Sequence, residues 1–260
     1  MAESTLSLQF TDFQAEVGEY LGEQRSGWDT PTTNRINAVI NQAYPEALYP
    51  QPLNGKEKGH QWSFLEPIVT LTTTAAEYAY DLPDNYGAIL GPLTWDDANV
   101  GGGVIPIVSE GKIRQMRQGS DVTGRPTHAA TRTKTFDPTV GQRSEIIFFP
   151  TPDGEYDLSY RSSLIVALKL DATNKFPIGG MSFGRVVLAA CLAVAERKYR
   201  RGENTMQAAF MTSLAAEISR DLQNAPEYFG YNGDRSSSYL RGCRSHAGER
   251  LTVNGLPTTP

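Results

Sequence analysis

The sequence predicts an α+β protein in which a helical bundle domain contains an inserted antiparallel β domain and is followed by an extended C-terminal tail. Apolar residues recur at helical intervals in two regions, near residues 11–47 and 181–222. Between these regions the hydrophobic period changes to two, in short runs separated by Gly, Pro and Asp. No periodicity follows Pro226. These observations divide the chain into N-terminal helices (1–59), the inserted β domain (60–170), a helical hairpin that completes the bundle (171–228) and the tail (229–260).

The N-terminal part predicts two helices. The first covers residues 11–22, because Thr11 and Gln14 have capping-box spacing and apolar residues follow at helical intervals. The second starts at Thr30, with Pro31 in the first helical position, where a missing N–H costs nothing. Pro45 is expected to bend or stop this helix near residues 42–44, because it removes one helical hydrogen bond.

The middle of the chain predicts a small antiparallel sheet or sandwich, because its candidate strands are short and bounded by turn residues. A brief polar helical turn is expected at residues 110–117. Large residues at the start of this region are interpreted as packing that joins the helical and β parts, since aromatic side chains dominate buried area. The residues assigned to this junction are Trp62, Phe64, Leu65, Tyr80, Leu82 and Pro83. The candidate strands are residues 68–74, 77–83, 88–95, 104–108, 128–136, 144–150 and 156–168.

The C-terminal helices are expected from Met181 to the basic run before Gly202, and from Thr205 to Leu222, before Pro226. A short loop between them predicts a helical hairpin. Cys191 lies in the first of these helices, where a buried reduced thiol is the expectation.

Residues typical of catalysis or metal binding are scattered along the chain. His60, His128 and His246 lie in unrelated segments, and the spacing between Cys243 and His246 lacks the second ligand pair of a zinc site. The glycine-rich segments at 101–103 and 119–124 lack the pattern of a phosphate-binding loop. We therefore expect no catalytic residue, no cofactor and no metal, and predict that the protein is not an enzyme.

The balance of charge argues against a protein that coats nucleic acid by bulk electrostatics. Lys and Arg number 24 against 29 Asp and Glu, which gives a net charge of −5. One segment, residues 111–134, is locally basic, and is interpreted either as a solvated loop or as a face for phosphate or an acidic partner. The sequence has no apolar run long enough for a membrane span and no leader pattern at Met1, so a soluble protein that is not secreted is expected.

Several short motifs recur in a fixed order in one family. The chain resembles the head-to-tail adaptor, or connector, proteins of tailed bacteriophages over roughly residues 10–232. The motifs that carry the resemblance are Val17, Gly18, Leu21 and Gly22, then 62–65 (WSFL), 80–83 (YDLP), 113–119 (IRQMRQG), 124–126 (GRP), 150–161 (PTPDGEYDLSYR), Ala195 with Glu196, and Asp221 with Pro226.

The resemblance implies a structural virion protein that is made in the host cytoplasm and assembles in the neck. Such a protein forms a ring, twelvefold in this family, that joins the portal at the capsid vertex to the tail or nozzle protein. Double-stranded DNA passes through the ring without sequence-specific binding, and no membrane is involved. Two other functions are carried as alternatives, a head-completion protein that binds the DNA end through the basic segment, and a hydrolytic tail component, for which no carboxylate pair has suitable spacing.

The tail combines aromatic side chains with arginines, a composition suited to ordering against a partner. We expect it either to be a simple unstructured terminus or to dock on the portal. The candidate portal-contact residues are Tyr228, Phe229, Tyr231, Arg235, Tyr239, Arg241, Arg244 and Arg250.

Overall fold

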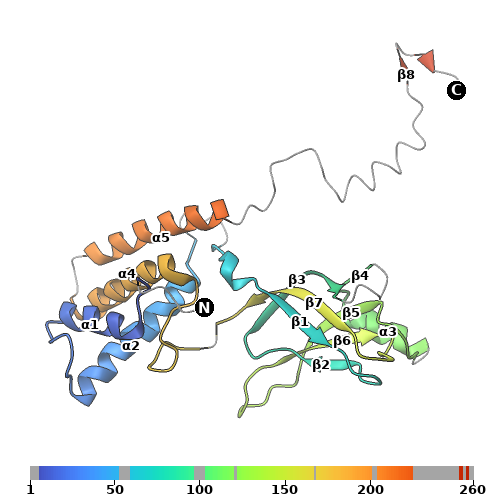
Figure 1. Cartoon of the computed structure of the whole chain (residues 1–260), viewed down its shortest axis with the longest axis horizontal. Coiled ribbons are helices and arrows are strands. Elements are labelled where there is room, and N and C mark those ends of the chain that lie inside the picture. Colours follow the sequence, from blue (N-terminus) through green and yellow to red (C-terminus); the bar gives the residue numbers. More distant parts are fainter. Residues whose placement is uncertain are drawn as a thin grey trace. The chain divides into compact units, whose positions relative to one another are not determined.

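The computed structural model describes residues 6–52, 59–96, 103–119, 122–166, 168–200, 204–224, 252–253 and 256–257. These residues contain five α-helices and antiparallel sheets, so the predicted α+β class is confirmed. The chain divides into two compact units, Met1–Ser219 and Arg220–Pro260. Figure 1 shows α1, α2, α4 and α5 as one group of helices, while α3 lies among the strands.

Helix α1 (Phe10–Tyr20) begins one residue earlier than predicted. The carboxylate of Asp12 accepts a hydrogen bond from the Gln9 backbone N–H at 2.8 Å, which stabilises the first turn. The predicted capping box of Thr11 and Gln14 is therefore wrong. Gln14 instead donates from Nε2 to Asn37 Oδ1 on the next helix, at 2.7 Å.

Helix α2 (Thr30–Leu48) is capped by Asp29 rather than by Thr30, since Asp29 Oδ1 accepts from the Thr32 backbone N–H at 2.9 Å. The helix continues through Pro45 for another turn, so of the predicted bend or stop near residues 42–44 the stop is wrong. Ala47 and Leu48, which follow the proline, are buried in the core of the helices. Their burial favours the helix by more than the lost hydrogen bond disfavours it.

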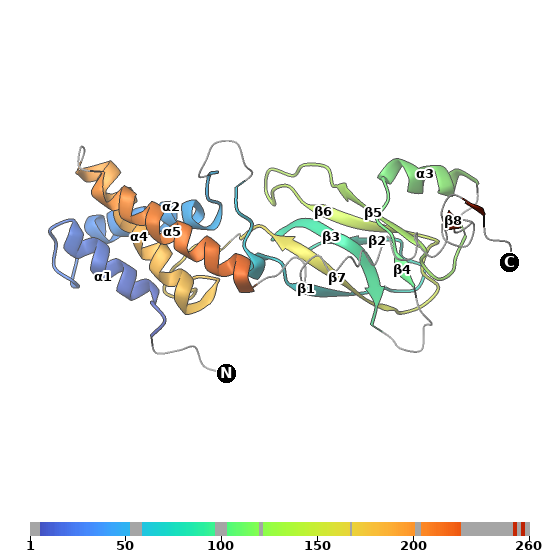
Figure 2. The same cartoon turned by 90° about the horizontal axis from the view of Figure 1, so that it is seen from above.

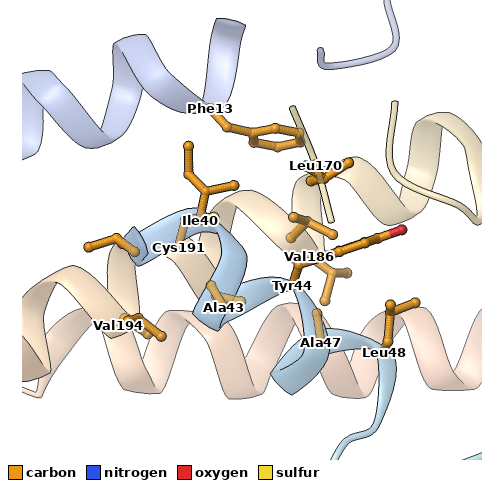
Figure 3. Packing of buried hydrophobic residues seen from close by; sticks show 14 of the residues in the cluster. Phe13, Ile40, Ala43, Tyr44, Ala47, Leu48, Leu170, Val186, Cys191 and Val194 are labelled. Carbon is orange, nitrogen blue, oxygen red and sulfur yellow. The ribbon is translucent and has the colours of Figure 1, made fainter. Parts of the chain in front are cut away.

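Helices α4 (Gly180–Tyr199) and α5 (Thr205–Asn224) occupy the two C-terminal segments that the periodicity predicts. They share one apolar core with α1 and α2. Figure 3 shows Phe13, Ile40, Tyr44, Val186 and Cys191 within this core. Other buried members include Val17, Ile36, Val39, Phe183, Val187, Ala190, Val194, Phe210 and Leu214.

Cys191 is fully buried in this core and carries a free thiol. Burial raises the pKa of the thiol well above its ordinary range, because the thiolate would lose its hydration. The prediction of a buried reduced cysteine is confirmed, whereas Cys243 lies outside the described residues.

Seven strands of the first unit form two antiparallel sheets. The larger sheet has the order β1 (Ile68–Thr72), β7 (Asp157–Leu164), β3 (Tyr86–Trp95) and β4 (Val104–Ile105). The smaller has the order β2 (Ala79–Asp81), β6 (Ser144–Phe149) and β5 (His128–Thr133). All seven lie within or beside the predicted strand segments.

The two sheets face each other across a second apolar core, so the sandwich alternative is the correct one. Leu93 and Leu158 of the larger sheet belong to the same buried cluster as Ile146 and Phe148 of the smaller sheet. Helix α3 (Glu110–Gly119) lies beside β5 and β6, as Figure 2 shows. Ile113 of this helix is buried against Ala130 and Ile147.

The described residues of the second unit that follow α5 form a small hairpin. Strands β8 (Thr252–Val253) and β9 (Leu256–Pro257) pair antiparallel, with Val253 opposite Leu256. This pairing was not predicted, although Asn254 and Gly255 between the strands form the most typical two-residue hairpin sequence. The other residues of the predicted tail lie outside the described residues.

Candidate interaction surfaces

The loop between α4 and α5 is fixed by one buried carboxylate. Glu196 of α4 is 2% exposed, and its carboxylate accepts hydrogen bonds from three backbone N–H groups at the start of α5. The donors are Thr205, Met206 and Gln207, at 3.1, 3.0 and 3.2 Å. These N–H groups have no partner within their own helix, and a buried carboxylate without hydrogen bonds would be costly.

This carboxylate caps the first turn of α5 and determines where that helix begins. In the sequence, Glu196 is distinguished only by its place in the family resemblance. The available signal was a single acidic residue within the apolar stretch of α4, since an isolated buried charge requires a partner.

The residues assigned to the domain junction fall into two different cores. Trp62 and Leu65 are buried with the helices, and Phe64 packs against the same cluster from the short 3₁₀ helix η1 (Ser63–Leu65). Tyr80 and Leu82 instead belong to the core of the sandwich, and Pro83 is exposed.

Trp62 is the centre of an aromatic group on the helical side. Its ring stacks on Phe64 at 5.5 Å and meets the edge of Phe183 at 5.0 Å, and its Nε1 donates to the Ala47 carbonyl oxygen at 3.3 Å. Gly179, which precedes α4, has a φ of +103° and lies against this group. A Cβ atom at this position would lie 2.8 Å from Cζ of Phe64, so the close approach requires glycine.

Tyr80 fastens the loop before β2 to the sandwich. Its hydroxyl accepts from the Thr74 N–H at 2.9 Å, and it lies at hydrogen-bond distance from the carbonyl oxygens of Thr74 and Glu77. Its ring meets Phe148 edge-on at 5.6 Å. Burial raises the pKa of Tyr80, because the phenolate would be poorly hydrated there. The role of Tyr80 is therefore internal to the β part.

Most cations of the basic segment have partners inside the protein. Arg114 pairs with Glu110 at 3.2 Å, Arg132 with Glu145 at 2.6 Å, and Lys134 with Asp81 at 2.7 Å. Two further arginines lie over aromatic rings: Arg117 over Tyr78 at 3.8 Å and Arg125 over Trp95 at 4.1 Å. The three ion pairs offset part of the positive charge that a phosphate-binding surface would need.

The described histidines occupy ordinary structural positions. His60 meets the edge of Trp62 at 4.7 Å, and Nδ1 of His128 lies 3.0 Å from Oγ1 of Thr127. Within the described ranges, no group of three or more His, Cys, Asp or Glu side chains is arranged to hold a metal ion. His246 and the portal-contact candidates, Tyr228, Phe229, Tyr231, Arg235, Tyr239, Arg241, Arg244 and Arg250, lie outside those ranges.

Two open pockets lie beside the segments that connect the helices to the sandwich. One, of about 300 Å³, is bounded by Leu48, Tyr49 and His60 with Ser163 and Ile165. The other, of about 370 Å³, is bounded mainly by apolar residues of the segment 164–178. Across the described part of the chain, no helix is both long and apolar enough to span a membrane.

A comparison with curated proteins gave no match. A family model described as SU10 adaptor protein matches residues 8–237, a range that takes in all five helices and both sheets of the sandwich. The chain therefore belongs to the SU10 adaptor protein family, a family of phage head-to-tail adaptors.

Proposed function

We propose that the protein is a structural component of the virion neck, where copies of it form a ring between the portal and the tail. The observation that carries this proposal is the family match across residues 8–237, which covers the helical and β parts together. The ring is twelvefold, with a passage for double-stranded DNA, and the protein performs no enzymatic reaction.

The proposed architecture is a helical domain, residues 1–59 and 171–228, with residues 60–170 inserted as a β domain and residues 229–260 as a tail. Two separate hydrophobic clusters support this division, one formed by helices and one by the two sheets. A subunit with two parts of different structure has two different faces, which is what head-to-tail contacts in a closed ring require.

The net charge suits a passage for DNA. With a charge of −5 the protein repels phosphate on average, so packaged DNA can move without being held. The alternative of a DNA-end-binding protein relied on residues 111–134. That segment gains no support from the structure, because Arg114, Arg132 and Lys134 are already paired with acidic side chains.

In this proposal the tail contacts the portal through the aromatic and arginine residues between Tyr228 and Arg250. Aromatic anchors and arginines dominate the binding energy of many protein interfaces. Helix α5 leads directly into this segment, and Glu196 fixes where α5 begins.

Deletion of residues 229–260 tests this contact. We expect the shortened chain to keep its unfolding transition and to lose co-elution with the portal protein of the same phage in size-exclusion chromatography. As the matched control, a chain that ends after Arg250 retains all of the portal-contact candidates and is expected to co-elute. Undiminished co-elution of the chain that lacks residues 229–260 would refute the assignment of the tail.

A further inference from the structure

One edge strand of the sandwich, β1, is longer than the edge strands β4 and β2 and, within the described residues, is not covered as β5 is. Strand β1 lies at the end of the larger sheet, and among the described strands its only neighbour is β7. At the opposite end, β4 has two residues, and β2 at one end of the smaller sheet has three. The edge of β5 is covered by the segment 106–108, through hydrogen bonds between Val108 and Ala129 and between Ala129 and Pro106.

Strand β1 has none of the features that protect exposed edges from pairing. It has five residues with the sequence Ile-Val-Thr-Leu-Thr, without a charge, a proline or a bulge. Native proteins usually interrupt such edges, because unpaired backbone groups act as a template for another strand. The absence of these features at β1 indicates an edge that pairs with another strand.

The backbone groups that point away from β7 can be identified from the ladder. Hydrogen bonds join Ser162 N–H to the Pro67 carbonyl and Thr73 N–H to the Tyr156 carbonyl. Residues alternate between the two sides of an antiparallel strand, so Ile68, Thr70 and Thr72 direct their N–H and C=O groups toward the open edge. Their side chains are exposed, and Ile68 is 76% exposed.

A candidate partner strand lies in the tail of the chain itself. Strands β8 and β9 have two residues each, and an isolated hairpin of that size is marginally stable in water. Such a hairpin gains stability by joining a larger sheet. Its residues follow Arg250, the last of the proposed portal contacts, so the two roles use different parts of the tail.

The hairpin can add to a sheet through β8 but poorly through β9. Val253 and Leu256 flank a two-residue turn and form the hydrogen-bonded pair, so Thr252 and Pro257 direct their backbone groups outward. Pro257 has no N–H to donate, whereas Thr252 offers both a donor and an acceptor.

We propose that β8 of one copy of the chain pairs with the open edge of β1 in a neighbouring copy, with Thr252 opposite Thr70. In an antiparallel register this places Val253 opposite Val69. Val69 and Leu71 are half-buried against the sandwich core, while Thr70 is exposed. The sequence Thr-Val of β8 therefore matches the alternation of a threonine and a valine at Thr70 and Val69 of β1.

This exchange is a head-to-tail contact, because the tail of each copy uses a different surface from the sheet edge that receives it. The inference rests on the proposed ring, in which neighbouring copies lie side by side. Residues 225–251 separate α5 from β8, and a chain of that length spans up to about 90 Å when extended. The tail is thus long enough to reach a neighbouring subunit.

Disulfide formation between the two strands tests the pairing. Hydrogen-bonded pairs have Cα atoms about 5.5 Å apart, which lies within the range that a disulfide bridges. In a Cys243→Ser background, the double variant Thr70→Cys and Thr252→Cys is oxidised with the portal protein present and absent. We expect a ladder of covalent multimers on a denaturing gel. The matched control is Thr133→Cys with Thr252→Cys, because Thr133 is also an exposed threonine on a strand, and it is expected to give no ladder.

Portal-bound protein that gives no ladder, that cross-links only within one chain, or that cross-links equally through Thr133 would overturn the strand exchange and leave the adaptor function intact. Failure of every variant, and of the unmodified chain, to bind the portal would count against the adaptor function itself.

A second pair of variants tests the backbone contribution. Thr70→Pro removes the outward N–H without removing a hydrogen bond to β7, whereas Thr70→Val keeps that N–H. We expect labelled subunits on the portal to exchange about tenfold faster in Thr70→Pro than in Thr70→Val, because one interfacial hydrogen bond is lost. Equal exchange rates would contradict the pairing.

Discussion

At the scale of single residues, Glu196 and Gly179 show how the helical core constrains the segments that enter and leave it. Glu196 supplies the hydrogen-bond acceptor for the first turn of α5, and Gly179 leaves room for the ring of Phe64 before α4. Neither role follows from hydrophobic periodicity, because one depends on a contact between two helices and the other on the absence of a Cβ atom.

Replacement of Glu196 is expected to destabilise the protein. Glu196→Ala removes the buried carboxylate that accepts hydrogen bonds from three backbone N–H groups at the partly exposed start of α5, which should reduce the free energy of unfolding by about 1–3 kcal/mol. Glu196→Gln keeps one acceptor oxygen and should lose less. Urea unfolding of the three proteins gives the comparison. Equal stability of Glu196→Ala and the unmodified chain would show that water hydrogen-bonds the N–H groups at the start of α5 equally well.

Gly179 and Gly180 form a natural pair for comparison, since both have a positive φ, of +103° and +76°. A Cβ atom at Gly179 would collide with Phe64 and Phe183, whereas at Gly180 it would meet no atom within 4 Å. Gly179→Ala should therefore lower the free energy of unfolding by about 2 kcal/mol more than Gly180→Ala, which incurs backbone strain alone. Thermal unfolding measures both variants. Similar losses of unfolding free energy would mean that the rings of Phe64 and Phe183 move aside at little energetic cost.

At the scale of secondary-structure elements, α2 depends on a cap whose strength varies with pH. Hydrogen bonds from Thr32, from its side chain first and its backbone N–H second, lower the pKa of Asp29 below its ordinary value of 3.8. A lowered pKa in the folded state stabilises the protein above the unfolded pKa, and this contribution is lost as the pH falls through the folded pKa.

The stability difference between the unmodified protein and Asp29→Ala should therefore be constant near neutral pH and shrink as the pH falls from about 5 to about 2. Asp29→Asn keeps an acceptor that does not titrate in this range, so its difference from Asp29→Ala should vary less. Urea titrations at each pH measure these differences, and a difference that grows toward acid would contradict the assignment of the cap.

Helix α3 is attached to the sandwich through Ile113 and Arg117. The Arg117 guanidinium donates to the Phe148 carbonyl at 2.8 Å and lies over Tyr78. We expect Arg117→Ala to lower the free energy of unfolding by about 1–2 kcal/mol, and Arg114→Ala, on the exposed side of the same helix, to change it by less than about 0.5 kcal/mol. Chemical denaturation separates the two. DNA binding is measured separately, in a salt series. A greater loss of DNA binding in Arg114→Ala than in Arg117→Ala would instead support the DNA-binding alternative.

Much of the element order was predictable from the sequence, because it depends on local signals. The β-branched runs around β1 and β6 and the apolar spacing of Phe210 and Leu214 identify their elements directly. Continuation of α2 past Pro45 was not predictable, since it depends on burial of residues that only the folded core provides. The separation of Trp62 from Tyr80 into different cores was missed for the same reason, because both are aromatic residues near a boundary and the sequence does not show which partners they meet.

At the scale of the whole molecule, the features relevant to assembly are the two cores and the surfaces around them. The described residues form a helical core and a sandwich core, and the cations of the basic segment are largely paired within the chain. Membership of the adaptor family implies portal and tail partners in general. In this account the open edge of β1 and the tail beyond α5 supply such contacts.

Electron microscopy of the purified protein mixed with the portal protein of the same phage, with each protein alone as a control, tests the central claim most directly. We expect a ring of twelve copies added coaxially to the portal, with an open channel along its axis. Absence of any added density, under conditions in which both proteins are folded, would contradict the adaptor function.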